Sequence, residues 1–160
     1  MRKRLMTALA LLAGALGSAA PPPASAGPAE EARRLYGAFV AAQNAHDFAA
    51  VRATLLDSPR FLWVSNGLSI WGVEPALRRM MGYHGAEIWR IDPLESRAVA
   101  VEAGPGSAFL HIPLELTFGE RAAPVRFRIL VTALCVATPT GWRIAGLFTT
   151  DANPEGGWPE

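Results

Sequence analysis

The feature that most constrains the fold is a stretch from Ala108 to Phe118 in which every second residue is apolar. The apolar positions of one parity are Ala108, Leu110, Ile112, Leu114 and Leu116. The other parity carries His111, Glu115 and Thr117. A period of two is typical of a strand with one buried face. This stretch therefore predicts a strand within a sheet that something else must cover.

The residues around this stretch predict more strands. From Ile88 onward the chain is rich in β-forming residues, with further strands expected over 96–103, 125–136 and 142–149 and turn residues at 104–106 and 138–141. The 125–136 strand is apolar on both parities: Phe127, Ile129 and Val131 on one, Leu130, Leu134 and Val136 on the other. One parity is expected to pack on helices. The other would stay exposed unless a second subunit covered it, so we expect a homodimer formed through the sheet.

The first half of the chain is mainly helical in pattern. Leu35, Ala38, Phe39 and Ala42 follow helical spacing, and a second apolar stripe runs through Phe48, Val51 and Leu55. A third helix is expected from 73 to about 83. Short strands over 60–64 and 68–71 flank Asn66-Gly67, a pair typical of a tight hairpin. Three helices followed by a run of strands predict an α+β fold in which a curved antiparallel sheet wraps the first helix and leaves a cone-shaped pocket.

His46 and Asp47 stand between the first two helical stripes and have two interpretations. Aspartate is a preferred N-cap, because its side chain accepts backbone N–H bonds at the start of a helix. A catalytic His-Asp pair would instead require the acid to orient the imidazole toward a nucleophile, and adjacent residues rarely point the same way. We therefore predict that Asp47 caps the second helix and that His46 ends the first.

The N-terminus has the parts of a secretory signal peptide. Basic residues at 2–4 precede a short apolar run over 5–17, and the segment ends in Ala24-Ser25-Ala26. We expect cleavage after Ala26, one domain over 27–160 with its core at about 30–150, no membrane span after cleavage, and a secreted or periplasmic location. Removing the leader leaves 12 Lys+Arg against 14 Asp+Glu, a net charge of −2, which gives no electrostatic case for binding nucleic acid.

Several motifs together resemble the SnoaL-like branch of the nuclear transport factor 2-like superfamily. They are the run Leu35 to Asp47, the Asn66-Gly67 hairpin, the Trp71-Gly72-Val73-Glu74 entry to the third helix, and the closing Gly141-Trp142-Arg143-Ile144 strand. The resemblance spans about residues 30–150. It implies a cone-shaped α+β fold, frequent sheet-to-sheet homodimers, and a pocket used by isomerases, cyclases, epoxide hydrolases and non-catalytic binding proteins. Fold alone does not decide among these functions.

The residues that catalyse isomerisation in this family are not matched here. Aligning on the helical corner and the hairpin places Val64 at the general-base aspartate of ketosteroid-isomerase-like members and Phe39 at their oxyanion tyrosine. No carboxylate occurs between Arg60 and Gly72. Acid and base residues of the polyketide-cyclase type are not evident either. No catalytic residue is therefore assigned, and whether the protein is an enzyme stays open.

Aromatic and methionine side chains are the candidates for a ligand site. A pocket between helices and sheet is expected to be lined by Tyr36, Phe39, Trp63, Met80, Met81, Trp89, Phe127 and Phe148. Ordinary core packing is the alternative for each of them. Phe39 and Trp63 are expected to face each other across the cone.

The remaining titratable residues support no cofactor or metal site. The three histidines lack ligand spacing, and neither a phosphate-binding glycine loop nor a nucleophile motif is present. His111 and Glu115 are expected on a solvated sheet face, and His84 in a loop or at the mouth of the cone. Cys135, the single cysteine, is expected to be a buried strand residue.

Three functions remain open from the sequence. The first is an exported pocket protein that binds a small apolar ligand without catalysis. The second is an enzyme of the isomerase, cyclase or hydratase type that uses the same pocket. The third is a dimerisation or interaction module. The missing base favours the first over the second.

Overall fold

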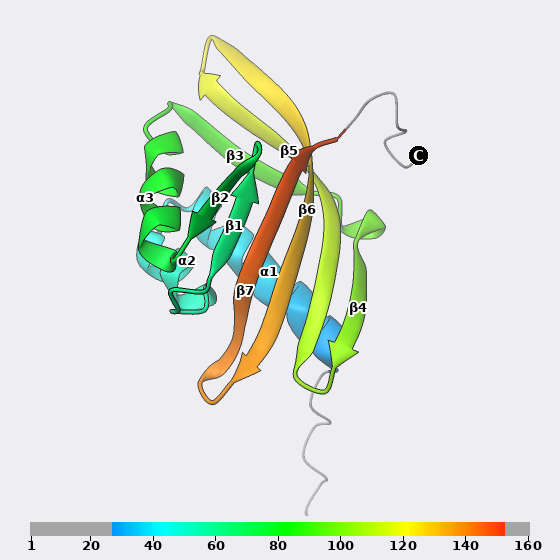
Figure 1. The fold of residues 1–160 in the computed structure, drawn as a ribbon. Helices are drawn as coiled ribbons and strands as arrows, with labels where there is room; N and C mark the ends of the chain where they lie inside the picture. The colour runs from blue at the N-terminus through cyan, green and yellow to red at the C-terminus, as the bar shows by residue number, and fades with distance from the viewer. Residues whose placement is uncertain (1–26, 153–160) are drawn as a thin grey trace, which may run out of the picture.

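A seven-stranded curved sheet wraps around the long helix α1 in the computed structural model, which describes residues 27–152 (Figure 1). The expected signal peptide lies outside these residues. The helices are α1 (Pro28–Asn44), α2 (Phe48–Thr54), α3 (Val73–Tyr83) and the short η1 (Glu95–Arg97). The strands are β1 (Leu62–Ser65), β2 (Leu68–Trp71), β3 (Ile88–Pro93), β4 (Val99–Gly104), β5 (Ser107–Glu120), β6 (Ala123–Thr138) and β7 (Gly141–Asp151). The predicted α+β fold, with three helices packed against a curved sheet, is confirmed.

The sheet is mixed, not purely antiparallel as expected. Its strand order is β2-β1-β7-β6-β5-β3, and β4 pairs with the part of β5 that β3 leaves open. The β1–β2, β5–β6 and β6–β7 pairs are antiparallel, whereas β1 runs parallel to β7. Turn residues reveal a hairpin and its register, but they carry no information about which distant strand the hairpin then joins. The parallel pair arises because α3 and the whole meander intervene between β1 and β7.

The corner between α1 and α2 forms as predicted. The Asp47 carboxylate accepts a hydrogen bond of 2.9 Å from the Ala50 backbone N–H and so caps α2. His46 takes a left-handed backbone with φ of 55°, which reverses the chain in one residue. Asn44 donates to the Ile91 carbonyl and accepts from the Ile91 N–H, both at 2.8 Å, and this pair ties the end of α1 to the edge strand β3.

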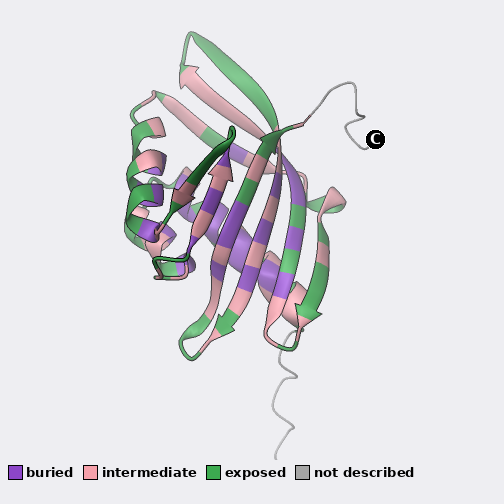
Figure 2. Ribbon diagram, in the orientation of Figure 1, coloured by how far each residue is buried: buried purple, intermediate pink, exposed green. Residues whose placement is uncertain are grey.

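The core lies between α1 and the inner face of the sheet (Figure 2). Its largest fully buried side chains include Phe61, Leu55, Leu110, Ile112 and Ile144. Cys135 is also fully buried on β6, as predicted, and burial raises the pKa of its thiol to about 12. We call this region, where β7 begins and the inward side chains of β5 are fully buried, the packed end of the sheet.

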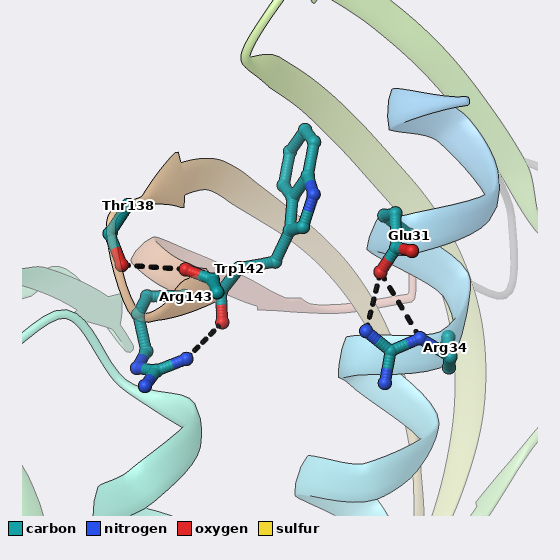
Figure 3. A network of polar contacts seen from close by, with 6 residues as sticks. Glu31, Arg34, Thr138, Trp142 and Arg143 are labelled. Carbon is teal, nitrogen blue, oxygen red and sulfur yellow. Dashed lines mark hydrogen bonds and ion pairs between the residues drawn. The ribbon is translucent and has the colours of Figure 1, made fainter. Parts of the chain in front are cut away.

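The β6–β7 hairpin closes the packed end (Figure 3). The Thr138 hydroxyl donates to the Gly141 carbonyl at 2.6 Å, and the Arg143 guanidinium donates to the Trp142 carbonyl at 2.8 Å. Gly141 has φ of 105°, a conformation that side chains rarely adopt. The Trp142 ring lies on the side of the hairpin that faces α1 and packs on the core. The hairpin is therefore held by its own polar contacts and by one large apolar side chain.

Candidate ligand-binding cavity

The opposite end of the sheet, where β1 and β7 finish and β6 begins, is not filled by side chains. A cavity of about 320 Å³ lies there between α1, α3 and the inner face of the sheet. Its lining is mostly aliphatic and aromatic: Tyr36, Phe39, Gln43, Trp63, Ser65, Asn66, Met80, Tyr83, Trp89, Ile91, Leu114, Leu116, Phe118, Phe127, Ile129, Val131, Leu147, Thr149, Thr150 and Asp151. We call this region the open end. Its volume is near the lower bound of the roughly 300–1,000 Å³ usual for small-molecule sites.

Six of the eight side chains expected from the sequence to line a pocket lie around this cavity. They are Tyr36, Phe39, Trp63, Met80, Trp89 and Phe127. Phe39 comes from α1 and Trp63 from β1, so the two rings belong to different walls of one space, as expected. Met81 points away from it and is exposed.

Phe148 lies on the outer face of the sheet, and its assignment to the pocket is wrong. Its partner on the parallel strand is Val64, and 39% of its surface is exposed. The cause is a β-bulge: Cys135 pairs with Ile144 but Leu134 pairs with Gly146, so Ala145 is an extra residue. A bulge reverses the alternation of faces. Ile144 and Leu147 are therefore both buried inward, and Phe148 points outward.

Trp63 is fixed in the cavity wall by a polar contact and a cation. Its indole N–H donates to the Thr149 hydroxyl at 3.2 Å, and that hydroxyl donates to the Val64 carbonyl at 3.0 Å. The Arg79 guanidinium lies 5.9 Å from the centre of the Trp63 ring and 5.4 Å from that of Tyr83. Two aromatic residues of the lining are thus held on either side of one arginine.

A cluster of rings forms the wall opposite Trp63. Tyr83 and Trp89 stack with centroids 5.9 Å apart, and Phe118 meets the edge of both. Such packing adds about 0.5–1.5 kcal/mol per pair beyond simple burial. The three rings therefore hold one another in place, and two of them, Tyr83 and Trp89, are nearly parallel at 15°.

Few polar groups reach the interior of the cavity. Tyr36, Gln43 and Ser65 are buried residues of its lining. Burial, with the nearby Glu95 and Cys135, raises the pKa of the Tyr36 phenol well above its ordinary value, so the phenol stays neutral. The buried part of the lining thus offers uncharged hydrogen-bonding groups.

Gln43 belongs to a polar chain that sequence reasoning missed. Its amide oxygen lies 3.4 Å from Nε2 of His84, and Nδ1 of His84 lies 2.9 Å from Nδ1 of His46. Burial, and then the neighbouring His46, lower the pKa of His84 to about 4. His84 was expected in a loop or at the cavity mouth. It lies in the turn directly after α3, as its C-cap, and its ring contacts Phe48 and Trp89.

Asp151 is the single carboxylate among the lining residues, and it lies beyond the strand expected from the sequence over 142–149. The structure extends β7 to Asp151, which pairs with the inward-facing Ile129. The bulge at Ala145, which turns Phe148 outward, also turns Asp151 toward the inner face of the sheet. Asp151 is exposed, so it marks the rim of the cavity, with Asn66, Phe127 and Thr150.

The outer face of the sheet carries the remaining polar candidates, as predicted. His111 Nδ1 lies 2.9 Å from the Thr132 hydroxyl, and Glu115 pairs with Arg126 at 3.5 Å. Arg128 is opposite Glu115 on this face. Between them lie apolar side chains, of which Phe109 and Phe148 are exposed. These groups are separated from the cavity by the sheet itself.

The geometry narrows the chemistry that this site can perform. Val64, aligned with the general base of isomerase members, faces outward, and its inward neighbour is Trp63, which cannot transfer a proton. No group of three or more His, Cys, Asp or Glu side chains within residues 27–152 could hold a metal ion. None of the helices in that range is long and apolar enough to cross a membrane. Asp151 is thus the one lining group that could serve as a carboxylate base.

Comparison with solved structures shows the nuclear transport factor 2-like fold, also called cystatin-like. An uncharacterised protein with a cystatin-like fold from Caulobacter vibrioides is 18% identical, with a TM-score of 0.69 over 81% of this chain and 92% of that chain. A ketosteroid isomerase-like protein from Erwinia carotovora atroseptica is 18% identical, with a TM-score of 0.64 over 79% of this chain and 97% of that one. A candidate dehydratase of the same fold from Streptomyces avermitilis is 16% identical, with a TM-score of 0.69 over 79% and 97%. No family model matches the sequence, and no curated protein matches it.

Proposed function

We propose that the protein is an exported binding protein of SnoaL-like type that takes up a small, apolar, flat molecule in the open end of its sheet. The single observation that carries the proposal is the cavity of about 320 Å³, which is lined by aromatic side chains from two helices and four strands and by few buried polar residues. Apolar pockets with a small number of placed polar groups are the usual form of small-molecule sites. Binding would remove Phe127, now 42% exposed at the rim, from water.

A fluorescence titration tests the proposal. N-phenyl-1-naphthylamine, a neutral aromatic probe, is added to the purified protein lacking residues 1–26, and energy transfer from the tryptophans is followed. We expect saturable binding of one probe per protein molecule. Because Trp63 and Trp89 are part of the cavity wall, energy transfer from them reports a probe bound there. Phe39→Ala should change the affinity, whereas Met81→Ala, which alters an exposed residue of α3, should not. Absence of saturable binding by this probe and by a set of other neutral bicyclic compounds would refute the proposal.

A catalytic role remains the second candidate, and Asp151 is the observation that favours it. A carboxylate at the rim of an apolar cavity can act as a general base toward a bound ligand. Turnover of a 3-ketosteroid or epoxide panel by the wild type, abolished in Asp151→Asn with ligand binding retained, would establish the enzyme. We expect no such turnover, because Asp151 is exposed to water and has no matched acid inside the cavity.

Homodimerisation and export complete the proposal. The outer face presents Phe109 and Phe148 beside Leu130, Leu134 and Val136, and an apolar face of this kind is suited to a second copy of the chain. N-terminal sequencing of the protein recovered outside the cytoplasm tests export: a chain that begins at Gly27 supports it, and a chain that still begins at Met1 contradicts it.

A further inference from the structure

Gln43 is a buried amide in the wall of an apolar cavity, and one of its two polar atoms is already used. It is 5% exposed and lines the cavity between Phe39 and the end of α1. Its oxygen faces Nε2 of His84 at 3.4 Å. An amide oxygen can only accept, so Nε2 of His84 must carry the proton of that contact. Among the described residues, the Gln43 NH₂ group has no hydrogen-bond partner.

The two histidines behind Gln43 determine which way its amide faces. Because Nε2 of neutral His84 holds the ring proton, Nδ1 is bare and accepts from Nδ1–H of His46 at 2.9 Å. His84 is kept in place by ring contacts, 4.4 Å from Trp89 and 4.8 Å from Phe48 between centroids. The exposed His46 therefore donates to His84, and His84 donates to the oxygen of Gln43. At the inner end of this series of hydrogen bonds, the NH₂ group of Gln43, a residue of the cavity lining, is left as a donor.

The surroundings of Gln43 favour an uncharged partner. The other buried polar residues of the lining are Tyr36 and Ser65, both neutral, and the one carboxylate, Asp151, lies at the exposed rim. An ionised ligand group would lose its hydration in the interior without meeting an opposite charge. A carbonyl or ether oxygen needs only one donor.

We propose that the Gln43 amide N–H binds a carbonyl oxygen on a neutral, flat, apolar ligand, and that His84 is the positioning residue that directs the amide. The inference rests on the proposed binding function and names the ligand class for the same cavity. It makes Gln43 the specificity-determining residue and leaves the aromatic walls to supply affinity.

A matched pair of probes distinguishes the proposed binding function from the proposed role of Gln43. 2-Acetylnaphthalene and 2-isopropenylnaphthalene are close in size and shape, because =CH₂ replaces =O on a trigonal carbon, but only the first has a carbonyl. We expect the wild type to prefer the ketone by roughly 2- to 10-fold, the effect of one hydrogen bond. Gln43→Leu should remove this preference and retain binding of the hydrocarbon. Tyr36→Phe and Ser65→Ala, which delete the hydroxyls of two other buried polar residues of the lining, should keep the preference.

A spectroscopic readout tests His84 as a positioning residue. A hydrogen bond lowers the stretching frequency of the bound ketone carbonyl, which infrared difference spectra measure directly. His84→Met should weaken this shift although it touches no ligand, whereas His84→Gln, which can place an amide N–H near the position of Nε2, should preserve it. Thermal denaturation of each variant confirms that it is folded. If His84 had a purely structural role, His84→Met would change the melting temperature, but the bound ketone would keep the carbonyl frequency that it has in the wild type.

The outcomes are distinguishable. If neither probe binds, the proposed function fails and the inference with it. If both bind equally and Gln43→Leu alters neither, the cavity binds ligands but the inference about Gln43 is wrong. If the preference is lost in Tyr36→Phe instead, the phenol binds the carbonyl and Gln43 does not.

Discussion

Leu110 and Leu116 lie on the same face of β5, and their surroundings differ. Leu110 is fully buried in the packed end, where it pairs with Ala133 of β6, whereas Leu116 is half-buried and borders the cavity of the open end. One strand thus serves two purposes along its length. The packed end supplies the stability of the fold, and the open end holds apolar side chains in position without filling the space between them. A protein that only needed to fold would gain by filling that space.

Truncation of each leucine should break or confirm this comparison. Leu110→Ala removes atoms from a site with no empty space and should lower the free energy of unfolding by about 2–5 kcal/mol. Leu116→Ala removes atoms that already border a cavity and should cost less than about 1.5 kcal/mol. Urea denaturation with a constant m-value measures both. Equal costs would mean that the open end is packed as tightly as the other.

Substitutions on the outer face of the sheet should change the association of two subunits. If a second copy covers it, Phe109→Glu places a charge in the interface and should weaken the dimer by at least roughly tenfold. Val125→Glu is the control, because Val125 is 51% exposed, more than Phe109 at 41%, but pairs with Phe118 on the inner parity. Light scattering against concentration reports both. A wild type that is monomeric at micromolar concentration would remove the homodimer from the account.

Lowering the pH should destabilise the open end of the sheet before the packed end. The unfolded His84 ring takes up a proton near its ordinary pKa of about 6.5, and the folded ring only near about 4. The unfolded state therefore binds more protons in this window, and stability falls as pH drops from about 6.5 to about 4. We expect a loss on the order of 1 kcal/mol, since the partly exposed ring is screened by water.

Amide exchange locates this effect. Exchange should accelerate first around Gln43 to Phe48 as pH falls, while the amides of β5 near Leu110 stay protected. His84→Gln should flatten the pH dependence. A uniform loss of protection over the whole sheet would contradict a local origin at His84.

The α1–α2 corner joins the two ends, and its cap gives the smallest expected effect. Asp47→Ala removes the hydrogen bond to the Ala50 N–H and should cost about 1 kcal/mol. Asp47→Asn, which keeps an accepting oxygen, should restore most of it. Because Asp47 lies outside the cavity lining, affinity for an apolar probe should be unchanged at temperatures where the variant is folded. Loss of an activity without loss of stability would restore the His46-Asp47 pair as a functional group.

Much of the fold could be predicted from sequence because its information is local. Helical stripes, the Asn66-Gly67 turn and the Asp47 cap each depend on a few neighbouring residues, and all form as expected. The parallel pairing of β1 with β7 could not be predicted, since it depends on where two distant segments meet.

The candidate site was predicted less completely, for a related reason. The bulge at Ala145 reverses parity, and its one local signal is the adjacent Gly146, since a glycine inside a strand marks a bulge only in some cases. This bulge accounts both for the misplaced Phe148 and for the missed Asp151. Gln43 did leave a signal: it follows Tyr36 by seven residues and so shares its helix face. Its connection to His84 and His46 needed the tertiary structure, because these residues come from different helices and a corner.

The most direct test of the account fills the cavity and measures binding. Ile129→Trp adds a large side chain on the inward parity of β6, and Leu130→Trp makes the same change on the next residue, which faces outward. We expect Ile129→Trp to fold, to keep or raise its melting temperature, and to lose affinity for N-phenyl-1-naphthylamine by at least roughly tenfold, since its ring occupies the volume that the probe needs. Leu130→Trp should bind the probe as the wild type does. Unchanged affinity in a folded Ile129→Trp variant would show that the probe binds elsewhere and would contradict the claim that the open end is a ligand site.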